Sequence, residues 1–297
     1  MNRQKSYSPS EDGGGASGAG VLYLVATPIG NLEDMTMRAI RILKEVGLVA
    51  AEDTRQTRKL LTHFEIQTRL VSYHEHNKGA SGPELIRLML EGQSIALVSD
   101  AGLPAISDPG ADLVASAVEN NIAVIPIPGA NAALSALIMS GLSTERFLFS
   151  GFPPRDKKSL GKWLQELSLN KETLIFYESP HRLTKTLDRM LEQLGNRKIA
   201  VVRELTKKHE EAIRGTITEC ISWFSEHTPL GEFCIIIEGA DPLEVSKADI
   251  EGAWWSELAI EAHVAHYESM MDRKEAIKKT AIDRGLPKRE VYNEVNR

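Results

Sequence analysis

Two patterns of apolar residues alternate along the chain: short continuous runs, and residues at helical spacing. Short β-branched or apolar runs predict buried strands at residues 21–26, 48–51, 70–73, 95–98 and 123–126. Between them, apolar residues at helical spacing predict helices at residues 37–46 and 83–90. Strands that alternate with helices indicate a sheet covered by helices, so the first half of the chain is predicted to be an α/β domain.

A second alternating set follows a Pro-rich, basic link at residues 152–158. A strand-like segment at 147–151 precedes the link, and further strands are expected at 173–177, 198–202 and 232–238. Helices are expected at 181–194 and 216–224. We therefore predict two α/β domains, at residues 21–146 and 147–240, preceded by a disordered tail at residues 1–20 whose second half is small and polar.

The end of the chain has a different character. From about residue 251 there is no strand signal, and helical runs at 274–284 and 288–295 flank the sequence Gly285-Leu286-Pro287. This pattern predicts a helix-turn-helix-like module at residues 251–297. Residues 241–272 carry eight acidic residues and one basic residue, whereas residues 273–297 carry eight basic and four acidic residues. This change of sign leaves two interpretations open, a nucleic-acid contact or an ordinary helical hairpin that closes the domain.

Composition limits the class of protein. Of the 297 residues, 42% are hydrophobic and 26% charged, as in a globular protein, and no apolar run is long enough to span a bilayer. The first twenty residues lack the apolar core of a secretory signal, and the two cysteines form no CxxC pair. We expect a cytoplasmic protein without a membrane contact. The net charge of −6 argues against non-specific coating of nucleic acid but is compatible with an RNA substrate.

Candidate binding loops follow three of the predicted strands, at the edge where an open α/β sheet forms its ligand crevice. The first is Thr27–Leu32, in which proline and glycine shape a tight loop with free backbone amides, although a plain turn capped by Asp34 or Thr36 is the alternative. The second, residues 99–110, is rich in small residues that let a ligand approach the backbone. In it Asp100 can accept hydrogen bonds from hydroxyl groups, and Asp108-Pro109 predicts the start of a helix.

The third loop, residues 126–133, opens an Ala-rich helix whose free N-terminal amides suit a carboxylate. Charged segments end two strands of the second half, at residues 177–182 and 203–208, and Ser179-Pro180 predicts a helix start. These charges can bind phosphate or transfer a proton, or they can form structural salt bridges among themselves. His74 and His76 have no third ligand at a recognisable spacing, so no metal is predicted.

The ordered motifs together resemble a known family. They are TPIGNLED (27–34), AEDTR (51–55), YHEHN (73–77), ALVSDAGLPAISDPG (96–110), PIPGANAALSAL (126–137), FLFSGFPP (147–154), FYESPHRL (176–183), RELTKKHEE (203–211) and RG (214–215). This succession resembles the ribosomal RNA small subunit methyltransferase I family of the tetrapyrrole methylase superfamily. The resemblance covers about residues 21–240 and implies 2′-O-methylation of a cytidine in the decoding region of small-subunit ribosomal RNA.

The resemblance also implies a fold and a cofactor. We expect two α/β domains of tetrapyrrole-methylase type with S-adenosylmethionine in the cleft between them, a small C-terminal helical module, and a homodimer. Three cofactor-binding segments are implied: Pro28, Gly30 and Asn31; Asp100, Ala101, Gly102, Pro104, Ile106, Asp108 and Gly110; and Pro128, Gly129, Ala130, Asn131 and Ala132. TPIGNLED replaces the superfamily's GxGxGD and points to its RNA branch, and Asn131 stands where proline is usual.

Catalytic candidates come from the charged strand ends. Glu178, Lys207 and Glu204 are candidates for the base or the electrostatic partner of the hydroxyl, and Arg182 and Arg203 for placing phosphates. Three alternatives remain at this point: a tetrapyrrole C-methyltransferase of the same fold, a non-catalytic nucleic-acid-binding protein that relies on the terminal helices, and a metal hydrolase built on His74 and His76.

Overall fold

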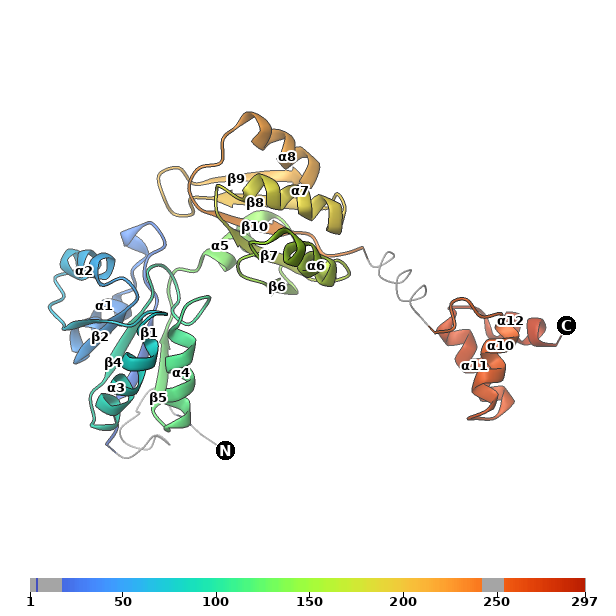
Figure 1. Ribbon diagram of the computed structural model, residues 1–297, viewed down its shortest axis with the longest axis horizontal. Helices are drawn as coiled ribbons and strands as arrows, with labels where there is room; N and C mark the ends of the chain where they lie inside the picture. The colour runs from blue at the N-terminus through green and yellow to red at the C-terminus, as the bar shows by residue number, and fades with distance from the viewer. Residues whose placement is uncertain (1–3, 5–17, 242–253, 297) are drawn as a thin grey trace. The chain divides into compact units, whose positions relative to one another are not determined.

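The computed structural model describes residue 4 and residues 18–241 and 254–296. Most of the predicted tail and the first residues of the predicted C-terminal module therefore lie outside the described residues. The chain forms two compact units, one comprising Met1–Gln165 and Glu172–Glu238, the other Glu166–Lys171 and Gly239–Arg297 (Figure 1). The first unit contains both sheets, and each unit is described by itself.

The first sheet is parallel, with strand order β3-β2-β4-β1-β5. Its strands are β1 (Val21–Val25), β2 (Leu48–Ala51), β3 (Leu70–Ser72), β4 (Ile95–Val98) and β5 (Ala123–Ile127). All four residues of β2 and of β4 are buried, as expected for strands covered on both faces. The five predicted strands are confirmed to within one residue at each end. Because the strands are parallel, the loops that follow them meet at one edge of the sheet.

Helices cover both faces of this sheet. They are α1 (Met37–Glu45), α2 (Thr54–His63), α3 (Lys78–Leu90) and α4 (Gly110–Glu119). Val21 and Val25 of β1 belong to the core cluster that contains Leu43 of α1, whereas Leu22 belongs to the cluster that contains Met89 of α3. This division follows from the alternation of side chains along a strand.

Two helices of the first sheet differ from the prediction. Helix α2 was not predicted, and α3 begins at Lys78 rather than at Pro83. The expectation rested on the helical spacing of the apolar residues between Pro83 and Leu90. Instead, the amides of Ala80 and Ser81 donate to the carbonyl of Asn77, so the turn forms before the proline, which lies inside the helix.

The second sheet is mixed, with order β6-β7-β10-β8-β9. Its strands are β6 (Phe147–Phe149), β7 (Thr173–Glu178), β8 (Lys198–Arg203), β9 (Glu211–Thr216) and β10 (Phe233–Ile237). Strands β6 and β7 are parallel, and the other pairs are antiparallel. Strand β9 was not predicted, because this edge strand contains charged residues and a glycine and has no fully buried position.

Four helices accompany the second sheet: α5 (Ala132–Ser140), α6 (Lys157–Leu167), α7 (Leu183–Leu194) and α8 (Ile217–Glu226). Ala133, Ala136 and Leu137 of α5 share a core cluster with β7, β8 and β10, so the helix that follows β5 already belongs to the core of the second sheet (Figure 1). Helix α6 begins inside the predicted link at Lys157. Helix α7 begins at Leu183, two residues later than predicted.

The second unit contains three helices in its described residues: α10 (Ile260–Glu268), α11 (Arg273–Asp283) and α12 (Lys288–Val295). They enclose a small core that includes Val264, Ile277 and Val291. The Asp272 side chain caps α11, and Gly285 turns the chain toward α12 with φ of +62°. Helix α10 was not predicted. Across the described parts of both units, every helix is too short or too polar to traverse a bilayer.

Candidate active site

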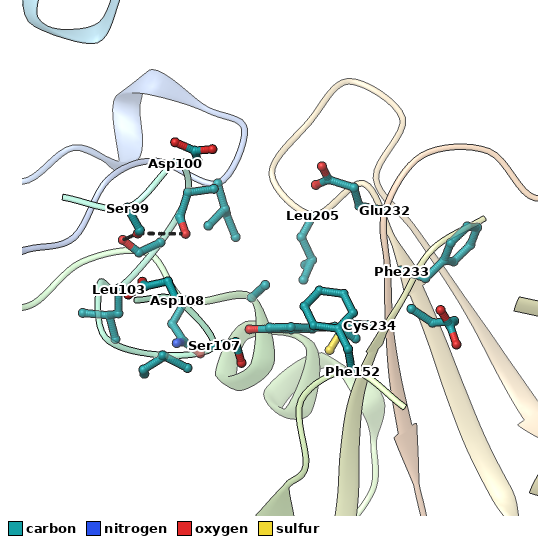
Figure 2. Close-up of a pocket in the computed structure, with 18 of the residues that line it drawn as sticks. Ser99, Asp100, Leu103, Ser107, Asp108, Phe152, Leu205, Glu232, Phe233 and Cys234 are labelled. Atoms are coloured by element: carbon teal, nitrogen blue, oxygen red, sulfur yellow. Dashed lines mark hydrogen bonds between the residues drawn. The ribbon is translucent and has the colours of Figure 1, made fainter. Parts of the chain in front are cut away.

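The loops at the carboxyl ends of the first sheet and the facing strands of the second sheet enclose a cavity of about 430 Å³ (Figure 2). This volume lies within the range of small-molecule sites. Its walls are formed by Ile29, Glu52, Ser99, Asp100, Ala101, Gly102, Leu103, Ile106, Ser107, Asp108, Asn131, Ala132, Phe152, Tyr177, Glu178, Ser179, Pro180, Val202, Leu205, Glu232, Phe233 and Cys234. In Figure 2, Asp100, Leu103 and Asp108 lie on one side, opposite Leu205 and Glu232.

The loop after β4, rich in small residues, supplies most of the first wall. Ala105 and Ser107 adopt φ of +68° and +61°, in the left-handed region that costs a non-glycine residue free energy. The Asp108 carboxylate holds this conformation, accepting the amides of Ala105 at 2.9 Å and Gly110 at 2.7 Å. Burial raises the pKa of Asp108. Helix α4 begins at Gly110, one residue after the predicted start. The Asp108 carboxylate still accepts the amide of this first helical residue, as a capping side chain does.

Two further carboxylates, Asp100 and Glu52, line the cavity. Asp100 accepts a hydrogen bond from the amide of Asp53 at 2.9 Å, which joins the loop after β4 to the loop after β2. Glu52, at the end of β2, lines the cavity, and its pKa is raised by burial and then by the neighbouring charges of Asp100 and Asp108. Sequence reasoning did not select Glu52. Its position directly after a buried strand in AEDTR was the available signal.

The N-terminus of α5 forms part of the same cavity. The Asn131 side chain accepts the amide of Leu134 at 2.9 Å, so it acts as the helix cap. The next free amide, that of Ala133, donates to the Tyr177 hydroxyl at 3.2 Å. Asn131 and Ala132 line the cavity, whereas the preceding Pro-Gly-Ala residues do not. Tyr177 lies in the FYESPHRL motif, but the sequence alone predicts no role for it.

The loop after β1 lies at the border of the cavity. Only Ile29 of this loop lines it, and Asn31 caps a short 3-10 helix (η1, Leu32–Asp34) by accepting the amide of Glu33. Thr36 caps α1, as one of the two alternatives proposed. A Cβ atom placed on Gly30 would lie 2.4 Å from Cγ of Lys207, and the amide of Asn31 donates to the Thr206 hydroxyl at 3.1 Å. Glycine is therefore required where these two loops touch.

Of the cofactor-binding residues implied by the resemblance, seven line the cavity: Asp100, Ala101, Gly102, Ile106, Asp108, Asn131 and Ala132. The other eight do not line it: Pro28, Gly30, Asn31, Pro104, Gly110, Pro128, Gly129 and Ala130. Several of these lie next to the walls and shape them. Gly129, for example, passes so close to β1 that an added Cβ would lie 2.7 Å from Cβ of Ala26.

Among the five charged candidates, only Glu178 lines the cavity. Its side chain is fully buried, and its carboxylate accepts the amide of Ser179 at 2.8 Å and the hydroxyl of Thr186 at 2.6 Å. Arg182 lies 3.4 Å from this carboxylate and donates to the carbonyls of Pro153 and Pro154, both at 2.8 Å. The amides of Arg182 and Leu183 donate to the carbonyl of Ser179, so a hydrogen-bonded turn precedes α7.

Glu204 and Lys207 form a second charged group beside the cavity. The Lys207 ammonium lies 2.9 Å from Glu204 and 3.1 Å from Glu232, and Glu232 lines the cavity. Burial acts to lower the pKa of Lys207, but the two carboxylates raise it overall. Burial acts to raise the pKa of Glu204, but the bond from Lys207 and the amide of Glu232 lower it overall. Both side chains are therefore charged at neutral pH. Arg203 pairs with Glu211 at 3.1 Å.

The two histidines of the YHEHN motif have ring centroids 6.1 Å apart. The Asn77 side chain accepts the amide of His74 at 2.8 Å and donates to the carbonyl of Ser72, so this motif forms a turn before α3. Within the described ranges, no group of three or more His, Cys, Asp or Glu side chains is arranged to hold a metal ion.

The family model and several similar named proteins agree on one family. The model of the tetrapyrrole (corrin/porphyrin) methylases matches residues 21–221. Proteins named ribosomal RNA small subunit methyltransferase I are similar over nearly the full length. The one from Halalkalibacterium halodurans is 58% identical over 99% of this chain and 98% of its own, and the one from Bacillus subtilis 55% identical over the same shares. The one from Synechocystis is 48% identical over 92% and 96%.

Solved structures share the fold at much lower identity. A uroporphyrin-III-C-methyltransferase from Thermus thermophilus aligns with a TM-score of 0.53 and 21% identity, over 73% of this chain and 94% of that chain. A cobalt precorrin-4 methyltransferase aligns with a TM-score of 0.56 and 15% identity, over the same shares. At these identities the likenesses show the fold alone.

Proposed function

This chain belongs to the tetrapyrrole methylase family and, within it, to the ribosomal RNA small subunit methyltransferase I group, and from that premise we propose that it transfers a methyl group from S-adenosylmethionine to the 2′-hydroxyl of a cytidine in small-subunit ribosomal RNA. The relatives that are 48–58% identical carry the RNA methyltransferase name. The fold neighbours that act on tetrapyrroles are at most 21% identical. A tetrapyrrole substrate is therefore not favoured.

The observation that carries this proposal is the cavity at the carboxyl ends of the first sheet. It is lined on one side by backbone and small side chains, at Ala101, Gly102 and Ala132, which permit close approach of a ligand. S-adenosylmethionine contains a sulfonium, an ammonium, a carboxylate, ribose hydroxyls and an adenine. A wall of this kind, together with carboxylates, fits that set of groups.

Individual residues suit individual parts of the cofactor. Asp100 and Glu52 are placed to accept hydrogen bonds from hydroxyl or ammonium groups, and their charge favours a cation. The N-terminus of α5, at Ala132, favours a carboxylate. Leu103, Ile106 and Leu205 supply apolar surface for a flat ring. When bound, the cofactor would supply a methyl group already activated by the sulfonium.

The protein's main contribution would be alignment. Holding the ribose hydroxyl and the methyl donor in near-attack geometry can supply on the order of 7–11 kcal/mol of the barrier. In this proposal Lys207 supplies positive charge where the hydroxyl loses its proton, because its paired carboxylates keep it protonated at the edge of the cavity. Glu204 orients Lys207. Arg203 remains the candidate for a phosphate contact.

Arg182 receives a different role from the phosphate contact expected from the sequence. The Arg182 guanidinium is committed to two backbone carbonyls and to Glu178, so we assign it to positioning of the Pro153–Pro154 segment rather than to phosphate. Glu178 remains a candidate to accept the proton, since it lines the cavity. The proposal further includes a homodimer that acts in the cytoplasm, which light scattering and cell fractionation test.

The decisive experiment uses small ribosomal subunits that lack the modification. They are incubated with the protein and labelled S-adenosylmethionine, and the modified nucleotide is mapped. We expect label on the 2′-oxygen of one cytidine, and absence of transfer would refute the proposal. Lys207→Ala is expected to lower the rate about 10²-fold or more. Lys198→Ala is the matched control, because Lys198 is also ion-paired but its partner, Glu238, does not line the cavity, whereas Glu232, a partner of Lys207, does. Wild-type rates for both Lys207→Ala and Glu178→Gln would remove these residues from the mechanism.

A further inference from the structure

Phe152 has an unusual position for a phenylalanine. Its side chain is 59% exposed, yet it forms part of the cavity wall on the side of the second sheet (Figure 2). An isolated exposed apolar residue needs no explanation. Phe152 is not isolated, however, because its ring centroid lies 5.4 Å from that of Tyr177, which in turn lies 5.0 Å from Phe149. One side of the ring is thus supported by Tyr177, while more than half of the side chain remains exposed.

The backbone around Phe152 is held at several points. The amide of Tyr177 donates to the carbonyl of Gly151 at 2.9 Å, and two prolines follow Phe152 directly. The Arg182 guanidinium binds the carbonyls of both prolines at 2.8 Å. Gly151 has φ of +66°, and a Cβ there would lie 3.5 Å from the hydroxyl of Ser107, so this segment borders the loop after β4. We call residues 150–154 the rim segment.

Arg182 is itself fixed by a buried charge. The Glu178 side chain is fully buried, and burial of a carboxylate is costly unless it is paired and hydrogen-bonded. Glu178 has the Thr186 hydroxyl and the Ser179 amide as donors, and Arg182 as its counter-charge. Apolar residues of similar volume often replace a buried ion pair without loss of stability. The charged pair does something that an apolar pair cannot: Glu178 fixes Arg182, and Arg182 in turn holds the rim segment through the carbonyls of Pro153 and Pro154.

From this arrangement we infer that Phe152 is a preorganised stacking surface for the nucleobase of the target nucleotide. The inference rests on the proposed function. Proteins that recognise single-stranded RNA commonly stack bases on aromatic side chains, and a ring whose position is already fixed loses little entropy on binding. The exposure of Phe152 favours the incoming substrate over the cofactor adenine, for which the buried Leu205 offers apolar surface. A base stacked there would fix its ribose beside the methyl donor.

The test compares variants by two separate measurements. KM for undermethylated small subunits is obtained from methyl transfer, and Kd for S-adenosylmethionine from titration calorimetry. For Phe152→Ala we expect KM for the subunits to rise about tenfold, as alanine substitutions at base-stacking aromatics typically do, with the cofactor Kd within twofold of wild type. Phe152→Trp should keep a wild-type KM, and Phe152→Leu should resemble alanine because it is apolar but has no aromatic face. Phe147→Ala is the matched control, since Phe147 is 43% exposed on the same sheet but does not line the cavity.

Three results would overturn the inference. A rise in the cofactor Kd without a change in KM for the subunits would show that the ring stacks on adenine. Wild-type kinetics for Phe152→Leu would show that only apolar bulk is needed. An equal loss in Phe147→Ala would show a general effect on the sheet. A wild-type protein that binds no cofactor and transfers no methyl group would refute the proposed function itself, and this result is distinguishable because it appears before any variant is made.

Discussion

Arg182→Met should destabilise the protein and weaken substrate binding at the same time. The substitution keeps the length of the side chain but removes the counter-charge of Glu178 and both bonds to the carbonyls of Pro153 and Pro154. The buried carboxylate would keep only the Thr186 hydroxyl and the Ser179 amide as donors. We therefore expect a change in the stability of the second sheet and, through the rim segment, in the KM for RNA.

The size of the stability change follows from the geometry. Removing one partner of a fully buried ion pair costs about 3–5 kcal/mol. Arg182 retains 25% side-chain exposure and stands 3.4 Å from a carboxylate that has other donors, so the cost should fall toward the lower end. About 3 kcal/mol corresponds to a fall in Tm of roughly 6–12 °C for a domain of 150–250 residues. Thr186→Val removes one bond to the same charge at constant shape and should cost about 1.5–3 kcal/mol.

A double variant separates the two effects. In Glu178→Met with Arg182→Met no unpaired charge remains, so most of the lost stability should return, as apolar replacements of buried pairs have shown. The rim segment would still lack its donor, and KM for small subunits should stay several-fold above wild type. Thermal unfolding by circular dichroism and steady-state methyl transfer measure the two quantities. A stable Arg182→Met single variant would refute the energetic argument, and a double variant with wild-type KM would refute the positioning role.

The remaining predictions concern the loops and the carboxylates. Gly30→Ala should lower the methylation rate at least tenfold, because the new Cβ would lie 2.4 Å from Cγ of Lys207 and displace that side chain. The control is Gly161→Ala, where nothing lies within 4 Å of the added Cβ; it should keep full activity and stabilise α6 by about 0.5–1 kcal/mol. Comparable rates in the two variants would contradict this. Glu52→Gln should raise Tm at neutral pH, because the raised pKa of Glu52 means that its ionised form is disfavoured in the folded protein. The gain in Tm should be present above that raised pKa and vanish below the ordinary value of 4.5. A gain in Tm that does not depend on pH would argue against this explanation. Tyr177→Phe should cost about 1 kcal/mol, measured by thermal unfolding, because the Ala133 amide loses its acceptor; an unchanged Tm would show that water replaces the hydroxyl.

The parallel sheet was largely predictable because its physical signal is local. Buried strands such as β2 and β4 are continuous apolar runs, which stand out against the polar loops between them. Strand β9 lacked this signal because Glu211 and Arg214 interrupt it, and it forms only by pairing with β8. The start of α3 depended on backbone bonds to Asn77 that outweigh the usual position of proline. Local preference therefore failed where a neighbouring segment decided the conformation.

In the candidate site, too, features set by local sequence were predictable, whereas contacts between distant residues were not. The loop after β4 was recognisable because small residues and an acidic side chain directly follow a strand. The partners of the charged residues were not recognisable, since Arg182 binds carbonyls 28 and 29 residues away and Lys207 reaches Glu232 across 25 residues. Such contacts depend on how the strands of the second sheet are ordered. Sequence reasoning could name both salt bridging and phosphate binding for these residues but could not choose between them.

Backbone strain connects the two walls of the cavity. Of the six non-glycine residues with positive φ in the described chain, four flank the cavity: Ala105, Ser107, Glu204 and Thr206. Each such residue costs on the order of 1–3 kcal/mol and persists only where its surroundings enforce it. Asp108 enforces the first pair through the amide of Ala105, and Glu210 enforces the second by accepting the amide of Thr206 at 2.6 Å. Both walls thus depend on a carboxylate that binds backbone amides and so fixes the loop that carries the cavity-lining residues, Ser107 on one side and Leu205 on the other.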